Sequence, residues 1–169
     1  MSSQRIRRRV HEEGHVRKFL VVLDETPECE KAVYFGAARS RSTGSMLTML
    51  YVVEPPEFAH WLAVEEHARE EGEQKAQALF RMYQRKLKQW GFEDLPVETV
   101  IRYGNPCEEI RGLENDDPDI SFLVLGASVE EEGPGRLVTG LLTKGTKGFP
   151  TPIVIVPGDM TFDEIQALA

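Results

Sequence analysis

The sequence has few cysteines and no long apolar run. Cys29 and Cys107 are its only cysteines in 169 residues, which is too few for a disulfide framework and typical of a reducing compartment. No apolar stretch approaches the roughly 20 residues that a membrane-spanning helix needs. The basic start is followed by no apolar segment before Phe19, which argues against a secretory signal. These absences predict a cytoplasmic protein without a membrane partner.

Positive charge is also scarce. The chain has 20 basic and 28 acidic side chains, a net charge of -8, and phosphate contacts along a nucleic acid need concentrated Lys and Arg. We therefore expect no nucleic-acid partner. Residues 1–18 are the exception, with six basic and two acidic side chains. Residues 1–16 are predicted to be a basic arm, which is either disordered or loosely docked, or else contacts an anion or the acidic face of a second copy.

Five short apolar runs alternate with segments of helical periodicity. The runs at 19–23, 46–53 and 120–125 are continuous, as in strands that are buried on both faces of a parallel sheet. The runs at 95–103 and 153–156 complete the set, and the first of these alternates as an edge strand does. Such alternation of strands and helices predicts one α/β domain, residues 17–158, with a parallel sheet. The predicted helices are 27–42, 58–90, 106–115, 137–147 and a short one within the tail 159–169.

Local signals set the ends of these helices. Thr26 and Pro27 have the residue types of an N-cap and a first helical position, and Gly44 fits the C-terminal cap. The helix over 58–90 carries an apolar stripe that includes Trp61 and that we interpret as core. Its acidic side chains are predicted to form a solvated face: Glu65, Glu66, Glu70, Glu71 and Glu73.

Several fragments resemble one known family in their order and spacing. Asp24 ends the first strand, Tyr51 to Glu54 closes the second, Gly104-x-Pro106 opens the third helix, and Val124-Leu125-Gly126 ends the fourth strand; Thr151-Pro152 precedes the last. From about residue 17 to 158 the chain resembles the universal stress protein family. The resemblance implies an open, doubly wound sheet in the order 3-2-1-4-5, a Rossmann-like three-layer α/β/α fold. Its cleft lies beyond the carboxyl ends of the strands.

The resemblance also implies where a ligand binds. In nucleotide-binding members an aspartate and a second-strand valine hold the adenosine, and by position these are Asp24, with Thr26 beside it, and Val52. An alternative for Asp24 is that it caps neighbouring backbone amides, because a carboxylate at the end of a buried strand needs partners. The alternative for Val52 is that it belongs to the core.

The phosphate motif of the family, Gly-x2-Gly-x9-Gly-Ser/Thr, fits the chain in two registers. The gapless register starts at Gly126 and ends at Thr139-Gly140; the other ends at Gly145-Thr146 and leaves little room for a helix before Pro150. We prefer the first, although it places Val129 and three glutamates, residues 130–132, in the loop. The loop is then either a flexible acidic turn or an anion nest. The nest would consist of Gly126, Gly133, Gly135, Arg136, Thr139 and Gly140.

Two functional hypotheses follow from the resemblance. The first is a dimeric stress-response protein that binds ATP or another adenine nucleotide, with Mg2+ bridging phosphate and carboxylate. The second is a member that has lost nucleotide binding through Glu130, Glu131 and Glu132 and acts through protein contacts. We recognise no catalytic residue or metal site, and expect weak ATP hydrolysis at most; Cys107 is interpreted as a small buried residue.

A homodimer is predicted from the last strand. In the order that the resemblance implies, this strand lies at an edge of the sheet, yet it is apolar on both faces. Unpaired backbone and apolar side chains at an edge favour association with a second copy. The edge consists of Ile153, Val154, Ile155 and Val156.

Overall fold

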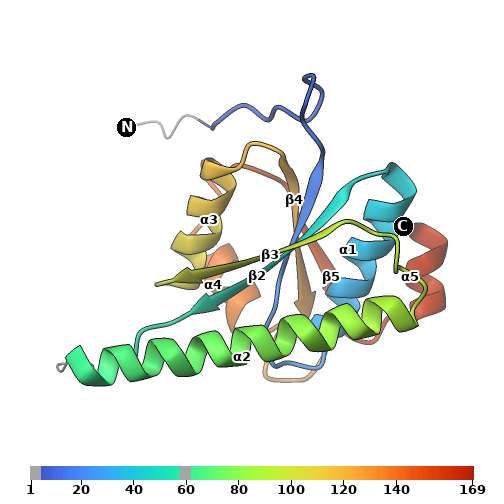
Figure 1. The fold of residues 1–169 in the computed structure, drawn as a ribbon. Coiled ribbons are helices and arrows are strands. Elements are labelled where there is room, and N and C mark those ends of the chain that lie inside the picture. The colour runs from blue at the N-terminus through green and yellow to red at the C-terminus, as the bar shows by residue number, and fades with distance from the viewer. Residues whose placement is uncertain (1–4, 58–61) are drawn as a thin grey trace.

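The computed structural model describes residues 5–57 and 62–169, and Figure 1 shows the strands crossing the middle of the molecule between the helices. The strands of this part are β1 (Lys18–Val22), β2 (Met46–Val53), β3 (Val97–Tyr103), β4 (Ile120–Ala127) and β5 (Ile153–Pro157). The helices are α1 (Cys29–Thr43), α2 (Leu62–Gln89), α3 (Pro106–Asp116), α4 (Arg136–Thr143) and α5 (Phe162–Leu168).

The strands form one parallel sheet in the order β3-β2-β1-β4-β5. The predicted topology is therefore confirmed, with β3 and β5 at the edges. β1 is central and the most apolar: Phe19, Leu20 and Val21 are at most 1% exposed. A continuous apolar run takes this place because helices cover both of its faces.

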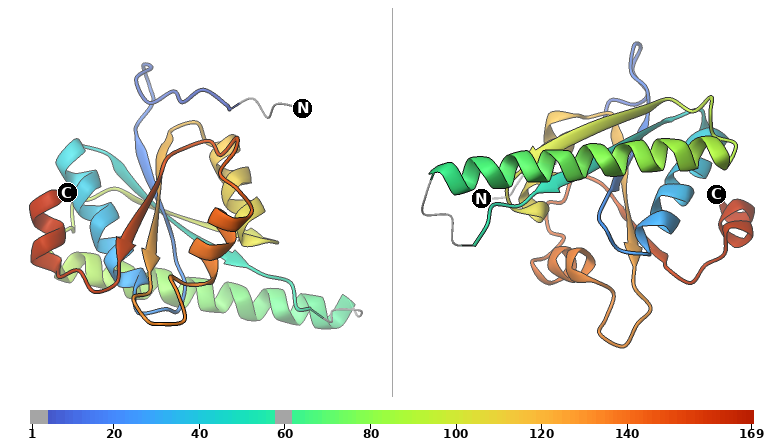
Figure 2. Two further views of the ribbon diagram at one scale, coloured as in Figure 1. Left: turned by 180° about the vertical axis from the view of Figure 1, so that it is seen from behind. Right: turned by 60° about the horizontal axis from the view of Figure 1, so that its bottom comes forward.

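Two apolar cores lie on opposite faces of the sheet. The core that includes Val21 and Met49 contains side chains of α1, α2 and α5, and the core that includes Leu20 and Leu50 contains side chains of α3 and α4. The left view of Figure 2 shows α1 and α5 on one side of the sheet and α3 and α4 on the other. The alternation of side chains along each strand supplies both cores, and the predicted three-layer arrangement is confirmed.

The helix ends agree only in part with the sequence prediction. Gly44 has the left-handed φ of 64° expected of a C-cap. The predicted cap at Thr26 is wrong, because α1 begins at Cys29 and its N-cap residue is Glu28. The amide and hydroxyl of Thr26 instead donate to Asp24 Oδ1. α4 is Arg136–Thr143 rather than 137–147. The predicted start of the second helix and Trp61 lie outside the described residues.

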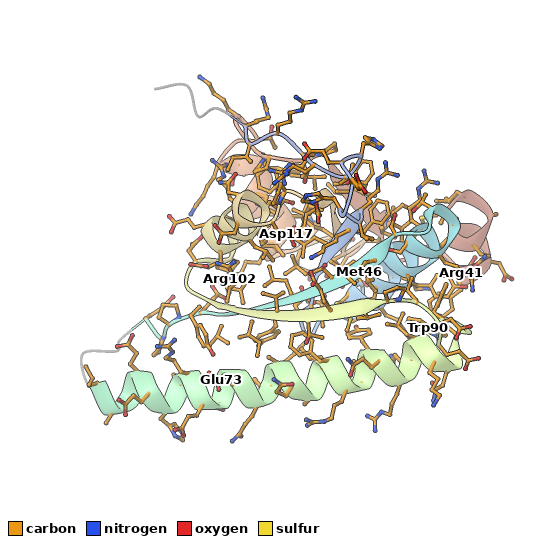
Figure 3. The ribbon with its side chains drawn as sticks, turned by 45° about the horizontal axis from the view of Figure 1, so that its top comes forward. Arg41, Met46, Glu73, Trp90, Arg102 and Asp117 are labelled. Carbon is orange, nitrogen blue, oxygen red and sulfur yellow. The ribbon has the colours of Figure 1, made fainter. Side chains whose placement is uncertain are left out.

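α2 lies along the sheet and extends beyond it, as Figure 3 shows from a third direction. Its buried side chains are Ala76, Phe80, Tyr83 and Leu87, all in its second half. The first half is exposed, including Leu62 at 77% and the predicted solvated glutamates. No helix of the described segments is long and apolar enough to cross a membrane.

Both ends of the described chain pack against the domain. In the basic arm, the Arg8 guanidinium donates to the main-chain oxygen of Glu114 at 2.7 Å, and the Arg9 amide donates to that of Pro118 at 3.0 Å. The arm is thus docked on its own chain beside the end of α3. At the other end, α5 packs on α1, and Ile165 is fully buried in the core.

Candidate functional site

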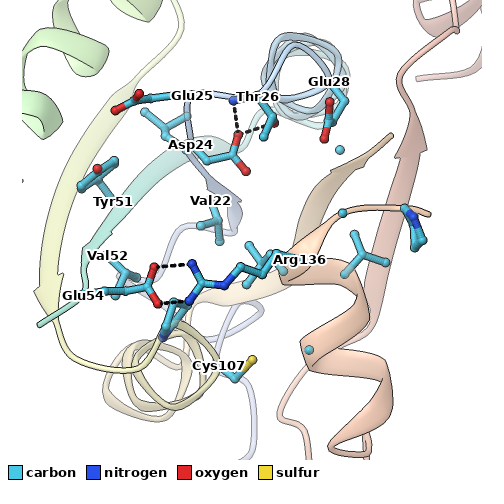
Figure 4. Close-up of a pocket in the computed structure, with 18 of the residues that line it drawn as sticks. Val22, Asp24, Glu25, Thr26, Glu28, Tyr51, Val52, Glu54, Cys107 and Arg136 are labelled. Atoms are coloured by element: carbon cyan, nitrogen blue, oxygen red, sulfur yellow. Dashed lines mark hydrogen bonds and ion pairs between the residues drawn. The ribbon is translucent and has the colours of Figure 1, made fainter. Parts of the chain in front are cut away.

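A cavity of about 450 Å3 opens at the carboxyl ends of β1, β2 and β4. The starts of α3 and α4 form its other walls, so the elements of the predicted cleft do converge (Figure 4). Parallel strands end here together, and α3 and α4 begin beside them. The geometry suits a small polar ligand.

The structure brings most of the predicted binding residues to this cavity. Gly133 and Thr139 are the exceptions and do not line it. Thr139 is an exposed residue within the first turns of α4, and its amide already donates to the Gly135 oxygen at 3.0 Å. The predicted residues that line the cavity are Asp24, Thr26, Val52, Gly126, Gly135, Arg136 and Gly140.

Asp24 fulfils the capping role that the sequence analysis left open. Its Oδ1 atom accepts from the Thr26 amide at 2.9 Å and from the Thr26 hydroxyl, a local turn that carboxylates of this type often form. Figure 4 shows that the carboxylate nevertheless lies at the rim of the cavity. One oxygen is therefore fixed by the turn, and the group as a whole faces the space in which a ligand would bind.

The loop between β4 and α4 is bonded mainly to itself. The Ser128 amide donates to the Pro134 oxygen at 3.0 Å, and the Gly133 amide donates to the Glu130 oxygen at 3.1 Å. The Glu130 amide donates to the Ser128 hydroxyl at 3.2 Å. These amides are therefore not directed at the cavity as an open anion nest would require.

One motif glycine is explained by packing inside the protein. A Cβ on Gly126 would lie 2.3 Å from the Glu28 oxygen, so β4 tolerates no side chain where it passes the start of α1. A Cβ on Gly140 would lie 3.4 Å from Cys107 Sγ, close to an ordinary contact between α4 and α3. Gly126 therefore has a structural reason independent of any ligand, whereas packing does not require a glycine at 140.

The start of α4 closes one side of the cavity. Its N-cap residue, Gly135, has a φ of 108° and makes no side-chain cap hydrogen bond to the first-turn amides. Arg136 forms a two-point ion pair with Glu54, with nitrogen to oxygen distances of 2.6 and 3.1 Å. Figure 4 shows this pair between the end of β2 and α4. Arg136 is 85% exposed and thus free to exchange partners.

Carboxylates dominate the charge of the cavity. Asp24, Glu25, Glu28 and Glu54 line it, against the two cations of Arg136 and Lys144. These carboxylates affect the pKa of the phenol of Tyr51, another lining residue. Burial raises its pKa, and the charges of Glu25, Glu54 and Asp24 raise it further.

Sequence reasoning missed several of these lining residues. Glu28 was not predicted as a site residue, and Cys107 was interpreted as a small buried residue. Cys107 is half-buried in the first turn of α3, packs against the core and lines the cavity. Cys29 is fully in the core, and burial raises the pKa of its thiol to about 11. Among the missed residues, Tyr51 alone had a sequence signal for the cavity, because it directly precedes Val52 at a strand end.

The described residues also limit the chemistry. Across 5–57 and 62–169, there is no group of three or more His, Cys, Asp and Glu side chains that could hold a metal ion. His15 lies in the arm, where its Nδ1 is 2.6 Å from Asp119 Oδ1, and His67 is exposed on α2. His60 lies outside the described residues. A Mg2+ ion would therefore need the oxygens of a ligand in addition to those of the chain.

Comparison with known proteins agrees with this architecture. A search of curated proteins found no match. Among solved structures, the universal stress protein UspA from Lactobacillus plantarum is similar at 22% identity and a TM-score of 0.64, over 85% of this chain and 99% of that chain. A universal stress protein in complex with cAMP has 16% identity and a TM-score of 0.59, over 85% and 98%. One from Archaeoglobus fulgidus in complex with dAMP has 15% and 0.51, over 82% and 96%.

At these identities the solved structures establish the fold alone. The family follows from the sequence itself, because the model of the universal stress protein family matches residues 15–157. That match spans all five strands and the cavity at their ends. The chain belongs to the universal stress protein family.

Proposed function

We propose that this chain is a non-catalytic stress-response protein whose cavity binds an adenine nucleotide as a regulatory ligand. The observation that carries the proposal is the cavity of about 450 Å3 at the carboxyl ends of β1, β2 and β4. Open parallel sheets bind ligands at this edge, and small-molecule sites have volumes of roughly 300–1,000 Å3. The complexes of similar structures with cAMP and dAMP support the ligand class.

In this proposal the adenosine lies against the ends of β1 and β2. Val52 supplies an apolar wall, the ring of Tyr51 a flat surface, and the Asp24 carboxylate an acceptor for ribose hydroxyls. Thr26 orients Asp24 through the two hydrogen bonds of the turn. The phosphate end faces Gly135 and Arg136 at the start of α4, where backbone amides favour an anion.

The second candidate is a protein that has lost nucleotide binding and acts through protein contacts. The self-bonded loop with Glu130, Glu131 and Glu132 favours it, because three exposed carboxylates would repel a phosphate chain. The exposed first half of α2 offers the surface for such contacts.

A calorimetric titration with AMP, and with ATP plus Mg2+, tests the two candidates. We expect saturable binding that Asp24→Ala weakens roughly tenfold, the equivalent of one hydrogen bond to a charged group. Because Asp24 also holds the turn at Thr26, Val52→Phe is a second variant, which fills the cavity and leaves that turn intact. Asp94→Ala, an exposed site outside the cavity, is the matched control and should bind as the wild type does. Absence of binding at millimolar nucleotide would favour the second candidate.

We further propose that the protein is a cytoplasmic homodimer that associates through β5. Its Cys29 and Cys107 are free thiols, which supports a reducing compartment. β5 hydrogen bonds to β4 on one side, and its other edge has no strand within the described residues. Ile155 on this strand is 39% exposed, so pairing with a second copy would bury both backbone and apolar surface.

A further inference from the structure

Glu28 is an acidic residue that faces the cavity instead of capping its own helix. It is the N-cap residue of α1, but its side chain makes no cap hydrogen bond. The side chain is half-buried and lines the cavity, as Figure 4 shows. A Cβ on Gly135 would lie 3.6 Å from Glu28 Oε1. The carboxylate thus lies next to Gly135, the N-cap residue of α4.

The glycines around Glu28 show that this position is built into the fold. A Cβ on Gly126 would lie 2.3 Å from the Glu28 main-chain oxygen, and a Cβ on Gly158 would lie 3.0 Å from Glu28 Cβ. A side chain at either glycine would displace Glu28. The bare backbone in β4 and just after β5 therefore accommodates the main chain and Cβ of Glu28.

The carboxylate of Glu28 lies where a phosphate chain would extend. Backbone amides at the start of a helix attract negative charge, and here an acidic side chain of the protein is already beside them. The neighbouring loop has few amides for a phosphate, because those of Ser128, Glu130 and Gly133 are hydrogen-bonded within the loop. Of the cations that line the cavity, Arg136 is paired with Glu54, which leaves Lys144.

Resting on the proposed nucleotide site, we propose that Glu28 selects ligands by phosphate number, so that the cavity takes adenosine and its monophosphates and discriminates against ATP. One phosphate can exchange with Glu54 for the exposed Arg136 guanidinium. Each further phosphate adds negative charge near Glu28, and Lys144 is the one cation that remains for it among the lining residues. The selectivity is electrostatic and needs no change of shape.

The test is a titration of wild type, Glu28→Gln, Glu25→Gln and Glu93→Gln with adenosine, AMP and ATP, with Mg2+ throughout. Glu28→Gln removes one charge at nearly constant volume, so we expect ATP affinity to rise roughly fivefold relative to adenosine, as for a charge pair near 4 Å in water. Glu25→Gln removes the same charge from the part of the cavity near Tyr51 and should have a smaller effect. Glu93→Gln, an exposed site outside the cavity, should leave all three affinities unchanged.

The outcomes separate this inference from the proposed function. Wild type that binds AMP more tightly than ATP, with the preference reduced in Glu28→Gln, supports the inference. Wild type that binds ATP more tightly than AMP overturns the inference and leaves nucleotide binding standing. Equal gains for all three ligands in Glu28→Gln also overturn it. If neither wild type nor any variant binds an adenine compound, the proposed function fails and the inference fails with it.

Discussion

Glu114 is a carboxylic acid in the interior of the protein. It lies on α3 with no exposed surface. Its Oε1 accepts from the Thr151 hydroxyl at 2.8 Å, and its Oε2 has no hydrogen-bond partner among the described residues. Burial raises the pKa of this carboxyl to about 7, against the opposing effects of the Thr151 hydrogen bond and of Arg8 and Arg111. A group of this kind couples folding to protonation.

The free energy of unfolding should therefore fall as the pH rises from about 4.5 to about 7. In that range the folded protein holds a proton that the unfolded chain has released, so the stabilisation is complete below the unfolded pKa and is lost above the folded one. A shift of this size corresponds to roughly 3 kcal/mol. Denaturant titrations at pH 5 and pH 8 should show a smaller difference for Glu114→Gln than for wild type. Glu108→Gln, an exposed site on the same helix, should retain the wild-type difference. An equal difference in the free energy of unfolding between pH 5 and pH 8 for all three proteins would contradict the prediction.

At the residue scale, the sequence predicts which residues end a strand better than it predicts which distant residues come into contact. Asp24 and Val52 were placed at the cavity through the family resemblance, which the visible ends of the apolar runs allowed to be aligned. Glu28 was not, because it meets Gly135 across more than a hundred residues of chain, and no local pattern encodes that contact. Gly133 and Thr139 were assigned by motif spacing, which cannot show that a loop will bond to itself.

At the scale of elements, the basic arm is hydrogen-bonded to the end of α3. The Arg8 guanidinium donates to the main-chain oxygens of Glu114, Asp117 and Ile120 at 2.7, 3.3 and 3.3 Å. The last carbonyl groups of a helix have no partners within it, and positive charge there is favourable. The Arg5 side chain adds a hydrogen bond of 2.8 Å to the Phe149 oxygen.

Arg8→Ala should lower the free energy of unfolding by about 1–3 kcal/mol, because several buried or half-buried carbonyl groups lose a charged donor. Arg7→Ala is the matched control, since Arg7 is exposed. Urea denaturation measures the difference, and limited trypsin digestion reports whether the arm is released. Equal stability of the two variants would mean that the docking of the arm contributes nothing measurable.

The order and type of the elements could be predicted from sequence, whereas some of their ends could not. Strands and helices differ in apolar periodicity, and that signal is long and redundant. The start of α1 could not be predicted, because Thr26 has the residue type of an N-cap but hydrogen bonds to Asp24 instead. α4 begins at Arg136 and ends at Thr143, because the helical backbone stops before Gly145, whose φ is 90°.

At the scale of the whole molecule, the two edges of the sheet, β3 and β5, differ in how they are covered. β3 at one side is covered by the long α2, which packs along β2 and β3. β5 at the other side has buried Val156 and exposed Ile155 in neighbouring positions. An apolar edge strand without cover is rarely left unpaired, which is the basis for the dimer proposed above.

Ile155→Lys should convert the protein from a dimer to a monomer, because a charge at the centre of the edge opposes its pairing with a second copy. Light scattering after size-exclusion chromatography measures this against the chain mass of 19.1 kDa. Val64→Lys makes the same kind of change on the exposed part of α2, where Val64 is 48% exposed, and should remain a dimer. A wild type that elutes as a monomer would refute the proposal.

The contacts at the two chain ends mean that the cooperative folding unit is larger than the family match. Residues 15–157 exclude both Arg8 and α5. Phe162 of α5 stacks on Tyr34 with ring centroids 4.6 Å apart and lies 5.3 Å from the ring of Trp90. A fragment cut at the family boundaries would leave these aromatic rings bare to water and the carbonyl groups at the end of α3 without their guanidinium.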